Sequence, residues 1–173
     1  IKLIGAMILM PPTHIHNLKK VVKTPGDLKG MKIHAAEAAL SKSASVAGAT
    51  PVELDIADMY MGLDRGLIDG VINHFPVLSV FGVIEMLKYH TVFGGGGINM
   101  TPMYLIFNAD TFNKLPSDIQ KIIADSGHIW TDKFYELDFA LQDKCISDCK
   151  GWNHNFTYLT PEQIKVWYDL VKG

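Results

Sequence analysis

MKIHAAEAALSKSASVAGATPVEL, residues 31–54, is the stretch that decides the fold class. It begins with a strand-like run over residues 31–34 and continues as a helical segment over residues 37–47. Gly48 follows where a helix C-cap is expected, and residues 51–54 form a second strand-like run. A strand, a helix and another strand in this order are typical of parallel strands joined by a helix that covers the sheet. The sequence therefore predicts an α/β fold with a mostly parallel sheet.

The same alternation extends on both sides of this stretch. The turn Thr24-Pro25-Gly26-Asp27 precedes it, and four consecutive glycines at residues 94–97 mark a boundary after it. Further strands are predicted over residues 5–10, 19–22, 69–73 and 103–108, and further helices from residue 55 or 57 to 65 and over residues 76–87.

A long helix is predicted near the C-terminus, where apolar residues recur at helical spacing from residue 116 to about residue 150. At 1.5 Å per residue such a helix reaches about 45 Å, more than one small domain needs. It is therefore expected to lie across two lobes. Thr160 and Gln163 fit a capping box and announce a last helix.

Composition excludes several classes of partner. The net charge of −2 comes from 18 acidic and 16 basic residues without a block of like charge, so no surface for nucleic acid or anionic lipid is indicated. No apolar run approaches the roughly 18 residues of a membrane span, so no direct membrane insertion is predicted.

Two cysteines, Cys145 and Cys149, lie four residues apart in the long helical pattern, where a disulfide is geometrically awkward. They continue its apolar stripe and are interpreted as packing thiols. The alternative is a redox or metal-binding pair.

Six segments, in order, resemble the solute-binding proteins of TRAP transporters, the DctP-like family. The first is TPGDLKGMKI at residues 24–33, and the others are GATPV at 48–52, IADMY at 56–60, GLIDG at 66–70, YLIFN at 104–108 and LPSDIQ at 115–120. The resemblance implies a bilobal type II periplasmic-binding-protein-like fold. It also implies a periplasmic receptor that binds a small organic solute and delivers it to TRAP membrane subunits, with no catalysis and no cofactor.

The match begins near the middle of the family pattern, so the chain is expected to be truncated and to lack most of the N-terminal lobe. The resemblance implies three parts. Residues 13–99 form the ligand-binding lobe, residues 100–127 return to the missing lobe, and residues 128–173 form the interlobe helix and the C-terminal helix.

The resemblance also implies the ligand-binding residues. His34 and His14 occupy positions where the family has arginines that pair with a carboxylate, and Asn73 matches a family asparagine. A neutral imidazole does not reproduce the two parallel donors of a guanidinium group, so an organic acid or a less polar solute is expected. Ile56, Tyr60 and Phe75, with Met10 close by in the pattern, complete the predicted pocket. His14, His34 and Asn73 are expected to converge at the C-terminal ends of the strands.

Two other functions remain open on the sequence alone. His14 and His16 would point to the same face of an extended segment, and with His34 they could bind zinc or copper in a metal-binding protein or metalloenzyme. A ligand-sensing domain of a regulator would use the same fold. His74, His90, His128 and His154 are isolated in the sequence and are expected on the surface or on helix faces. Motifs for nucleophilic catalysis or nucleotide binding are absent from the sequence.

Overall fold

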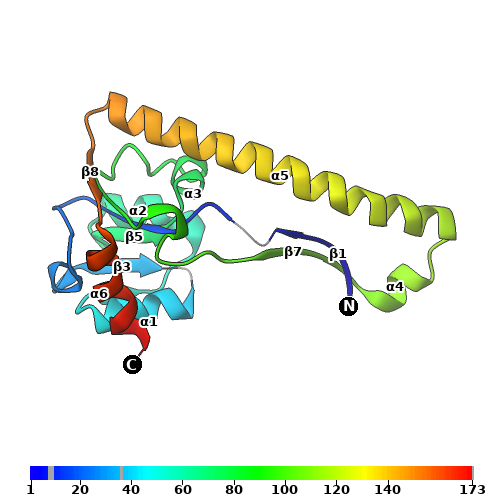
Figure 1. Cartoon of the computed structure of the whole chain (residues 1–173), viewed down its shortest axis with the longest axis horizontal. Coiled ribbons are helices and arrows are strands. Elements are labelled where there is room, and N and C mark those ends of the chain that lie inside the picture. The colour runs from blue at the N-terminus through cyan, green and yellow to red at the C-terminus, as the bar shows by residue number, and fades with distance from the viewer. Residues whose placement is uncertain (8–9, 36, 173) are drawn as a thin grey trace.

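Two β-sheets of unequal size organise the chain, and one long helix connects them (Figure 1). The computed structural model describes residues 1–7, 10–35 and 37–172. The strands are β1 (Lys2–Met7), β2 (His14–Asn17), β3 (Lys32–Ala35), β4 (Thr50–Val52), β5 (Gly70–Asn73), β6 (Tyr89–Val92), β7 (Met103–Phe107) and β8 (Asn155–Tyr158). The helices are α1 (Ala38–Val46), α2 (Met59–Asp64), α3 (Phe75–Val80), α4 (Ala109–Asn113), α5 (Ser117–Gly151) and α6 (Pro161–Lys172), with short 3₁₀ turns at Pro25–Leu28, Ile56–Asp58 and Gly94–Gly96.

The larger sheet has the strand order β4-β3-β5-β2-β6-β8. Strand β3 is parallel to both β4 and β5, and β6 is parallel to β8. Strand β2 is antiparallel to both of its neighbours, β5 and β6. The sheet is therefore mixed, with an antiparallel strand at its centre that the βα pattern of the sequence did not indicate.

Several predicted elements differ from the structure. The strand predicted at residues 19–22 is absent because Asn17 Oδ1 accepts hydrogen bonds from the backbone N–H groups of Lys19 and Lys20, which turns the chain there. The helix predicted over residues 76–87 ends at Val80, because Gly82 adopts a left-handed conformation with φ of 68°. Strands β6 and β8 and helix α4 were not predicted. Residues 8 and 9 of the strand predicted at residues 5–10 lie outside the described residues.

Each face of the larger sheet carries its own apolar core. Helices α1 and α6 cover one face, where Ile15, Ile33 and Ile72 point, and Trp167 of α6 packs there. Helices α2, α3 and the C-terminal part of α5 cover the other face, with Val71 and Phe75 at the centre of its core. Both cysteines, Cys145 and Cys149, are buried in this second core.

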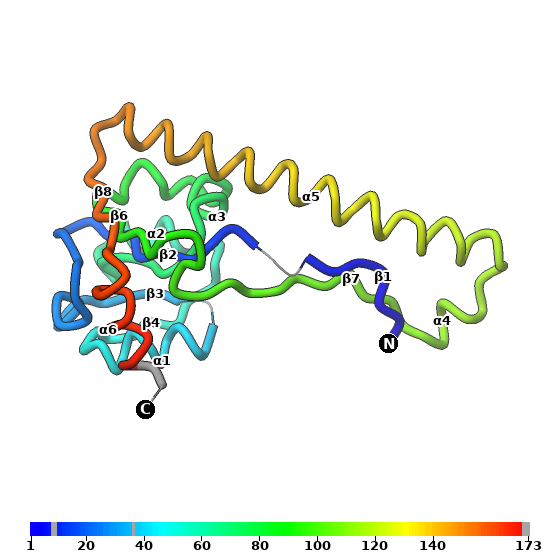
Figure 2. Tube along the Cα trace, viewed as in Figure 1, coloured from blue at the N-terminus to red at the C-terminus, as the bar shows by residue number. Residues whose placement is uncertain are grey.

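The smaller sheet pairs β1 with β7, antiparallel, and lies along the N-terminal half of α5 (Figure 2). Helix α5 has 35 residues and therefore a length of about 50 Å, close to the predicted one. Its C-terminal end packs on the larger sheet, while β1, β7 and α4 form an arm beneath the rest of it. Among the described residues, no helix combines the length and the apolar character needed to cross a membrane.

Candidate functional site

A cavity of about 220 Å³ lies where strand β5 ends. The sheet contributes Ile72 and Asn73, and helix α1 and the turn before it contribute Leu40 and Glu37. The remaining walls come from Ile56, His74 and Val77 and from the two segments that link the larger sheet to the arm, which contribute Met10, Pro11, Thr13, Thr101, Pro102 and Met103. The lining is mainly apolar, and the described residues that form it include no Lys or Arg.

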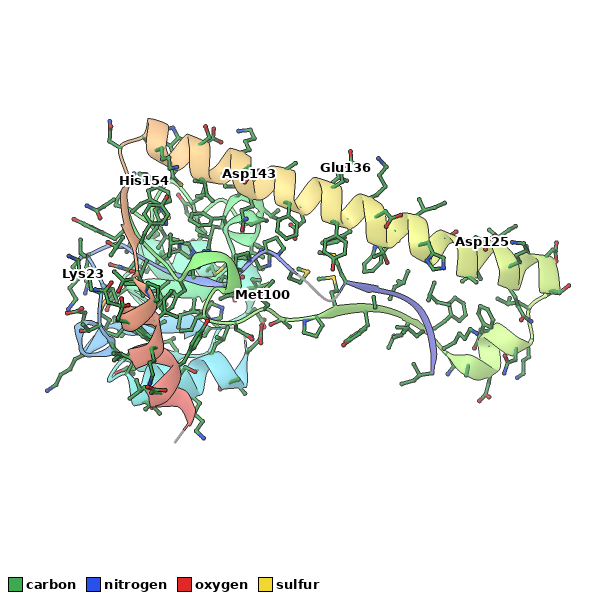
Figure 3. The ribbon with its side chains drawn as sticks, viewed as in Figure 1. Lys23, Met100, Asp125, Glu136, Asp143 and His154 are labelled. Atoms are coloured by element: carbon green, nitrogen blue, oxygen red, sulfur yellow. The ribbon has the colours of Figure 1, made fainter. Side chains whose placement is uncertain are left out.

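Hydrogen bonds fix the walls of this cavity. Asn99 Nδ2 and Thr101 Oγ1 donate to the two carboxylate oxygens of Glu37, at 3.0 and 2.5 Å. These bonds attach the crossing segment, where Met100 lies in Figure 3, to the start of α1. Thr13 is tied to the same segment by two backbone bonds, one donated to the carbonyl of Asn99 and one accepted from the N–H of Ile98. The two segments that link the larger sheet to the arm are thus bonded to each other, and both contribute to the wall of the cavity.

Asn73 supplies a half-buried polar side chain at the end of β5. Its Oδ1 accepts a hydrogen bond of 2.9 Å from the backbone N–H of His74, so the Nδ2 group carries the donors that remain for a solute. In the β2–β5 ladder Asn73 lies opposite His14, and in the β3–β5 ladder His34 lies opposite Val71. His14, His34 and Asn73 therefore share one face of the sheet.

His34 lines a different cavity from the one that Asn73 lines. Its Nδ1–H group donates to the carbonyl of Val52 at 3.2 Å, and its buried Nε2 atom has no partner among the described residues. It lines an open polar cavity of about 600 Å³ together with Ser41, Glu53 and Asp55. The described residues thus place His34 and Asn73 at two separate cavities along the same edge of the sheet.

The other predicted site residues are spread over three environments. Ile56 lines the cavity of Asn73. His14 is buried beside Phe75, with ring centroids 5.8 Å apart, and its Nδ1 accepts a bond from the backbone N–H of Phe93. Phe75 belongs to the core, and Tyr60 is 47% exposed on α2. Their roles in solute binding remain predictions.

Burial keeps several histidines neutral. It lowers the pKa of His14 to about 4, with a smaller contribution from His74, and lowers the pKa of His74 to about 4. The pKa of His90 falls to about 3 because of burial and the neighbouring His154 ring, and that of the fully buried His16 falls well below its usual range. Each of these rings therefore has one N–H donor and one nitrogen acceptor.

These neutral rings form a hydrogen-bonded chain that the sequence did not indicate. His16 Nε2 lies 3.1 Å from the carbonyl oxygen of Asn73, so this nitrogen must donate and His16 Nδ1 must accept. His90 Nδ1 then donates to His16 Nδ1 at 2.8 Å, and His154 Nδ1 donates to His90 Nε2 at 3.1 Å. Lys88 Nζ completes the chain by donating to His154 Nε2 at 3.2 Å.

The hydrogen-bonded histidines correct two predictions, one on the position of His90 and His154 and one on which residues could bind a metal. His90 and His154 are buried, not on the surface, and they come from segments 64 residues apart, so no spacing in the sequence could reveal them. Within the described ranges, the group of three possible metal ligands with atoms within 4.8 Å of one another is His90, Cys149 and His154. The predicted metal-binding set of His14, His16 and His34 is not such a group of ligand atoms. His16 Nδ1 bonds to His90, and His34 Nδ1 bonds to the carbonyl of Val52.

The comparison with known families decides the class of protein. The sequence pattern of the bacterial extracellular solute-binding proteins, family 7 (DctP), matches residues 13–173. The chain belongs to this family. This match confirms the prediction of a solute-binding protein of the DctP family.

Individual proteins are similar to this chain in sequence or in fold. The 2,3-diketo-L-gulonate-binding periplasmic protein YiaO of Escherichia coli is 27% identical over 113 residues, which are 65% of this chain and 34% of YiaO. A marine metagenome TRAP solute-binding protein specific for aromatic acids, solved with 3-hydroxybenzoate, superposes with a TM-score of 0.87 at 24% identity. A TRAP protein from Bordetella bronchiseptica, solved with (R)- and (S)-mandelate, gives 0.86 at 22% identity. Both structural matches cover 99% of this chain and 54% of the other, so the chain spans about half the length of these solved relatives.

Proposed function

We propose that this chain is the part of a periplasmic receptor that contains most of its solute-binding lobe, and that the receptor delivers a small organic acid to the membrane subunits of a TRAP transporter. The observation that carries the proposal is the cavity at the end of β5. In a chain of the DctP family, its walls come both from the sheet and from the segments that lead to the arm. Ligands of open α/β sheets bind at this carboxyl edge.

The lining of the cavity favours a solute with an apolar or aromatic body. Ile56, Ile72 and Val77 form apolar walls, and Asn73 Nδ2 offers neutral donors where a guanidinium fork is absent. Glu37 adds a negative charge to the lining, so a solute with two carboxylates is repelled more strongly than a solute with one. Two of the similar structures are solved with 3-hydroxybenzoate and mandelate, which are aromatic monoacids. An aromatic monoacid is therefore the proposed solute class.

A second lobe completes this proposal. The solved relatives are about twice as long as the part that this chain matches. Tyr104 and Ile106 of β7 are 54% and 55% exposed, and Ile122 and Ile129 of α5 are exposed as well. An apolar surface of this kind marks an interface. We infer that the rest of the receptor covers the arm and closes over the solute.

Calorimetric titration of the two-lobed receptor with 3-hydroxybenzoate, mandelate and malonate tests the proposal. We expect the aromatic monoacids to bind more tightly than malonate. Asn73→Ala should weaken binding by about 1–3 kcal/mol, the usual cost of leaving a buried polar partner unsatisfied. Asn113→Ala, an exposed position on α4, is the matched control and should leave the affinity unchanged.

His34→Ala in the same titration separates the two cavities. A loss of about 1–3 kcal/mol would include the cavity of His34 in the solute site, whereas an unchanged affinity would make His34 structural. If none of the acids binds the wild-type receptor, the proposed solute class is wrong. If they bind and Asn73→Ala has no effect, the proposed site is wrong.

A further inference from the structure

Three potential metal-ligand atoms, one sulfur and two nitrogens, lie together in the core between the larger sheet and α5. They belong to His90 of β6, Cys149 in the last turn of α5 and His154 in the turn before β8. All three residues are buried, with exposed fractions of 1%, 0% and 8%. We propose that His90, Cys149 and His154 bind one soft monovalent metal cation, Cu⁺. This inference does not depend on the proposed function.

The geometry is nearly that of a metal site. The three ligand atoms lie within 4.8 Å of one another, and His90 Nε2 and His154 Nδ1 are 3.1 Å apart. Two nitrogens bound to one metal at about 2.0 Å lie roughly 3.3–3.5 Å from each other, so small shifts of two rings suffice. Figure 3 places His154 beneath the C-terminal end of α5, and at 8% exposure it is the most exposed of the three ligands.

The hydrogen-bonded rings orient the first ligand. His90 Nδ1–H donates to His16 Nδ1, and His16 Nε2–H donates to the carbonyl of Asn73. These bonds fix the proton of His90 on Nδ1 and leave the lone pair of Nε2 directed at His154. A ligating histidine that donates its other N–H group to a fixed acceptor is the usual support of a metal site.

Ligand type and charge select the ion. Thiolate and imidazole ligands suit Cu⁺ and Zn²⁺. One thiolate balances the charge of a monovalent ion. A divalent ion would leave a net positive charge in the core beside Lys88, whose Nζ lies 3.2 Å from His154 Nε2. Phe156 packs against His90 and Trp152 against His154, so apolar rings enclose the ligands. A buried site of this kind favours the neutral pair of thiolate and Cu⁺.

The protons balance in a simple way. Cys149 releases its thiol proton to solvent when the cation binds to Sγ. The proton of His154 moves from Nδ1 to Nε2, and the ring stays neutral. The exposed Lys88 side chain then turns away, because Nε2 no longer accepts its hydrogen bond.

Anaerobic titration of the 173-residue chain with Cu⁺, in competition with a chromogenic cuprous chelator, tests the site. We expect one Cu⁺ ion per chain and an affinity that Cys149→Ser lowers by at least about 100-fold. Cys145→Ser is the matched control, because Cys145 is equally buried one turn earlier on α5 and lies outside the ligand group. Its affinity should stay within about threefold of the wild type.

Two further measurements keep the test decisive if Cys149→Ser fails to fold. His154→Gln, at the edge of the core, should also lower the affinity by at least about tenfold while circular dichroism shows an intact fold. X-ray absorption of the loaded chain should show one sulfur and two nitrogen neighbours around copper. The proposal is wrong if the chain does not bind Cu⁺ or if it prefers Zn²⁺ over Cu⁺. It is also wrong if Cys145→Ser loses as much Cu⁺ affinity as Cys149→Ser, because that result indicates a two-thiol site.

Discussion

At the scale of single residues, the most unusual feature is the number of neutral histidines held inside the protein. His14 and His74 have pKa values of about 4 because burial penalises the charged ring, against 6.5 in the unfolded chain. Between these two values the unfolded state binds protons that the folded state does not. The free energy of unfolding is therefore not reduced by these two histidines above pH 6.5, and their protonation in the unfolded state lowers it as the pH falls from about 6.5 towards 4.

His74→Gln should reduce this pH dependence. Each such histidine contributes up to about 1.4 kcal/mol per pH unit, or at most about 3.5 kcal/mol over the window. Urea denaturation at several pH values between 4 and 7 measures the slope, which we expect to be smaller in the variant. His128→Gln, at an exposed position on α5, should leave the slope unchanged. An identical slope for wild type and His74→Gln would show that His74 takes up its proton in the folded state.

How much of the site could be predicted differs from residue to residue. Asn73 and Ile56 line one cavity, and their positions followed from the segments GLIDG and IADMY that resemble the family. The ring chain of His16, His90 and His154 could not be predicted, since its members are distant in sequence and meet only after β2, β6 and β8 pair. Their burial depends on tertiary packing, which the sequence pattern around a lone histidine does not encode.

At the scale of elements, the contact of β1 with α5 depends on a close approach of two backbones. Gly127 lies in α5 where a Cβ atom would overlap the carbonyl oxygen of Ile4. Gly5 faces it, and a Cβ there would lie 2.9 Å from the carbonyl oxygen of Gly127 and 3.0 Å from the ring of Trp130. The arm can rest on the helix only because both positions are glycine.

Gly127→Ala should therefore destabilise the protein, although Ala is the better helix former by about 1 kcal/mol. We expect a net loss of about 1–3 kcal/mol from overpacking, or detachment of β1 from α5. Gly151→Ala, at the end of the same helix with open space around it, should be neutral or stabilising. Thermal and urea denaturation compare the two variants, and equal stability would contradict the close approach.

Helices and strands could be predicted where the local sequence pattern determines them. Helix α5 was placed within one residue at each end because its apolar positions keep the helical period over its whole length. Strands β6 and β8 were missed because their runs, YHTV and NFTY, are short. They become strands only by pairing with each other and, for β6, with β2. The antiparallel direction of β2 likewise depends on its pairing with β5 and β6, which are distant in the sequence.

At the scale of the whole molecule, the arm exposes apolar surface on both faces. Met103 and Leu105 of β7 are 40% and 37% exposed, and Tyr104 and Ile106, on the opposite face of the strand, are more exposed still. A two-stranded sheet on one helix buries too little apolar area to hide these side chains. In the proposed receptor the second lobe covers them, so the 173-residue chain studied alone must leave them in water or pair them with another copy.

We therefore expect the isolated chain to self-associate through the arm. The double variant Tyr104→Lys, Ile106→Lys should lower the association constant at least about tenfold, or about 1.4 kcal/mol, because it places two charges where apolar side chains would be buried. Val80→Lys is the control, since Val80 is 69% exposed at the end of α3, on the larger sheet and away from the arm. Sedimentation velocity over a range of concentrations measures all three proteins. The prediction is wrong if the wild-type chain stays monomeric. It is also wrong if Val80→Lys dissociates as readily as the double variant, because the arm would then not be the surface through which the chain self-associates.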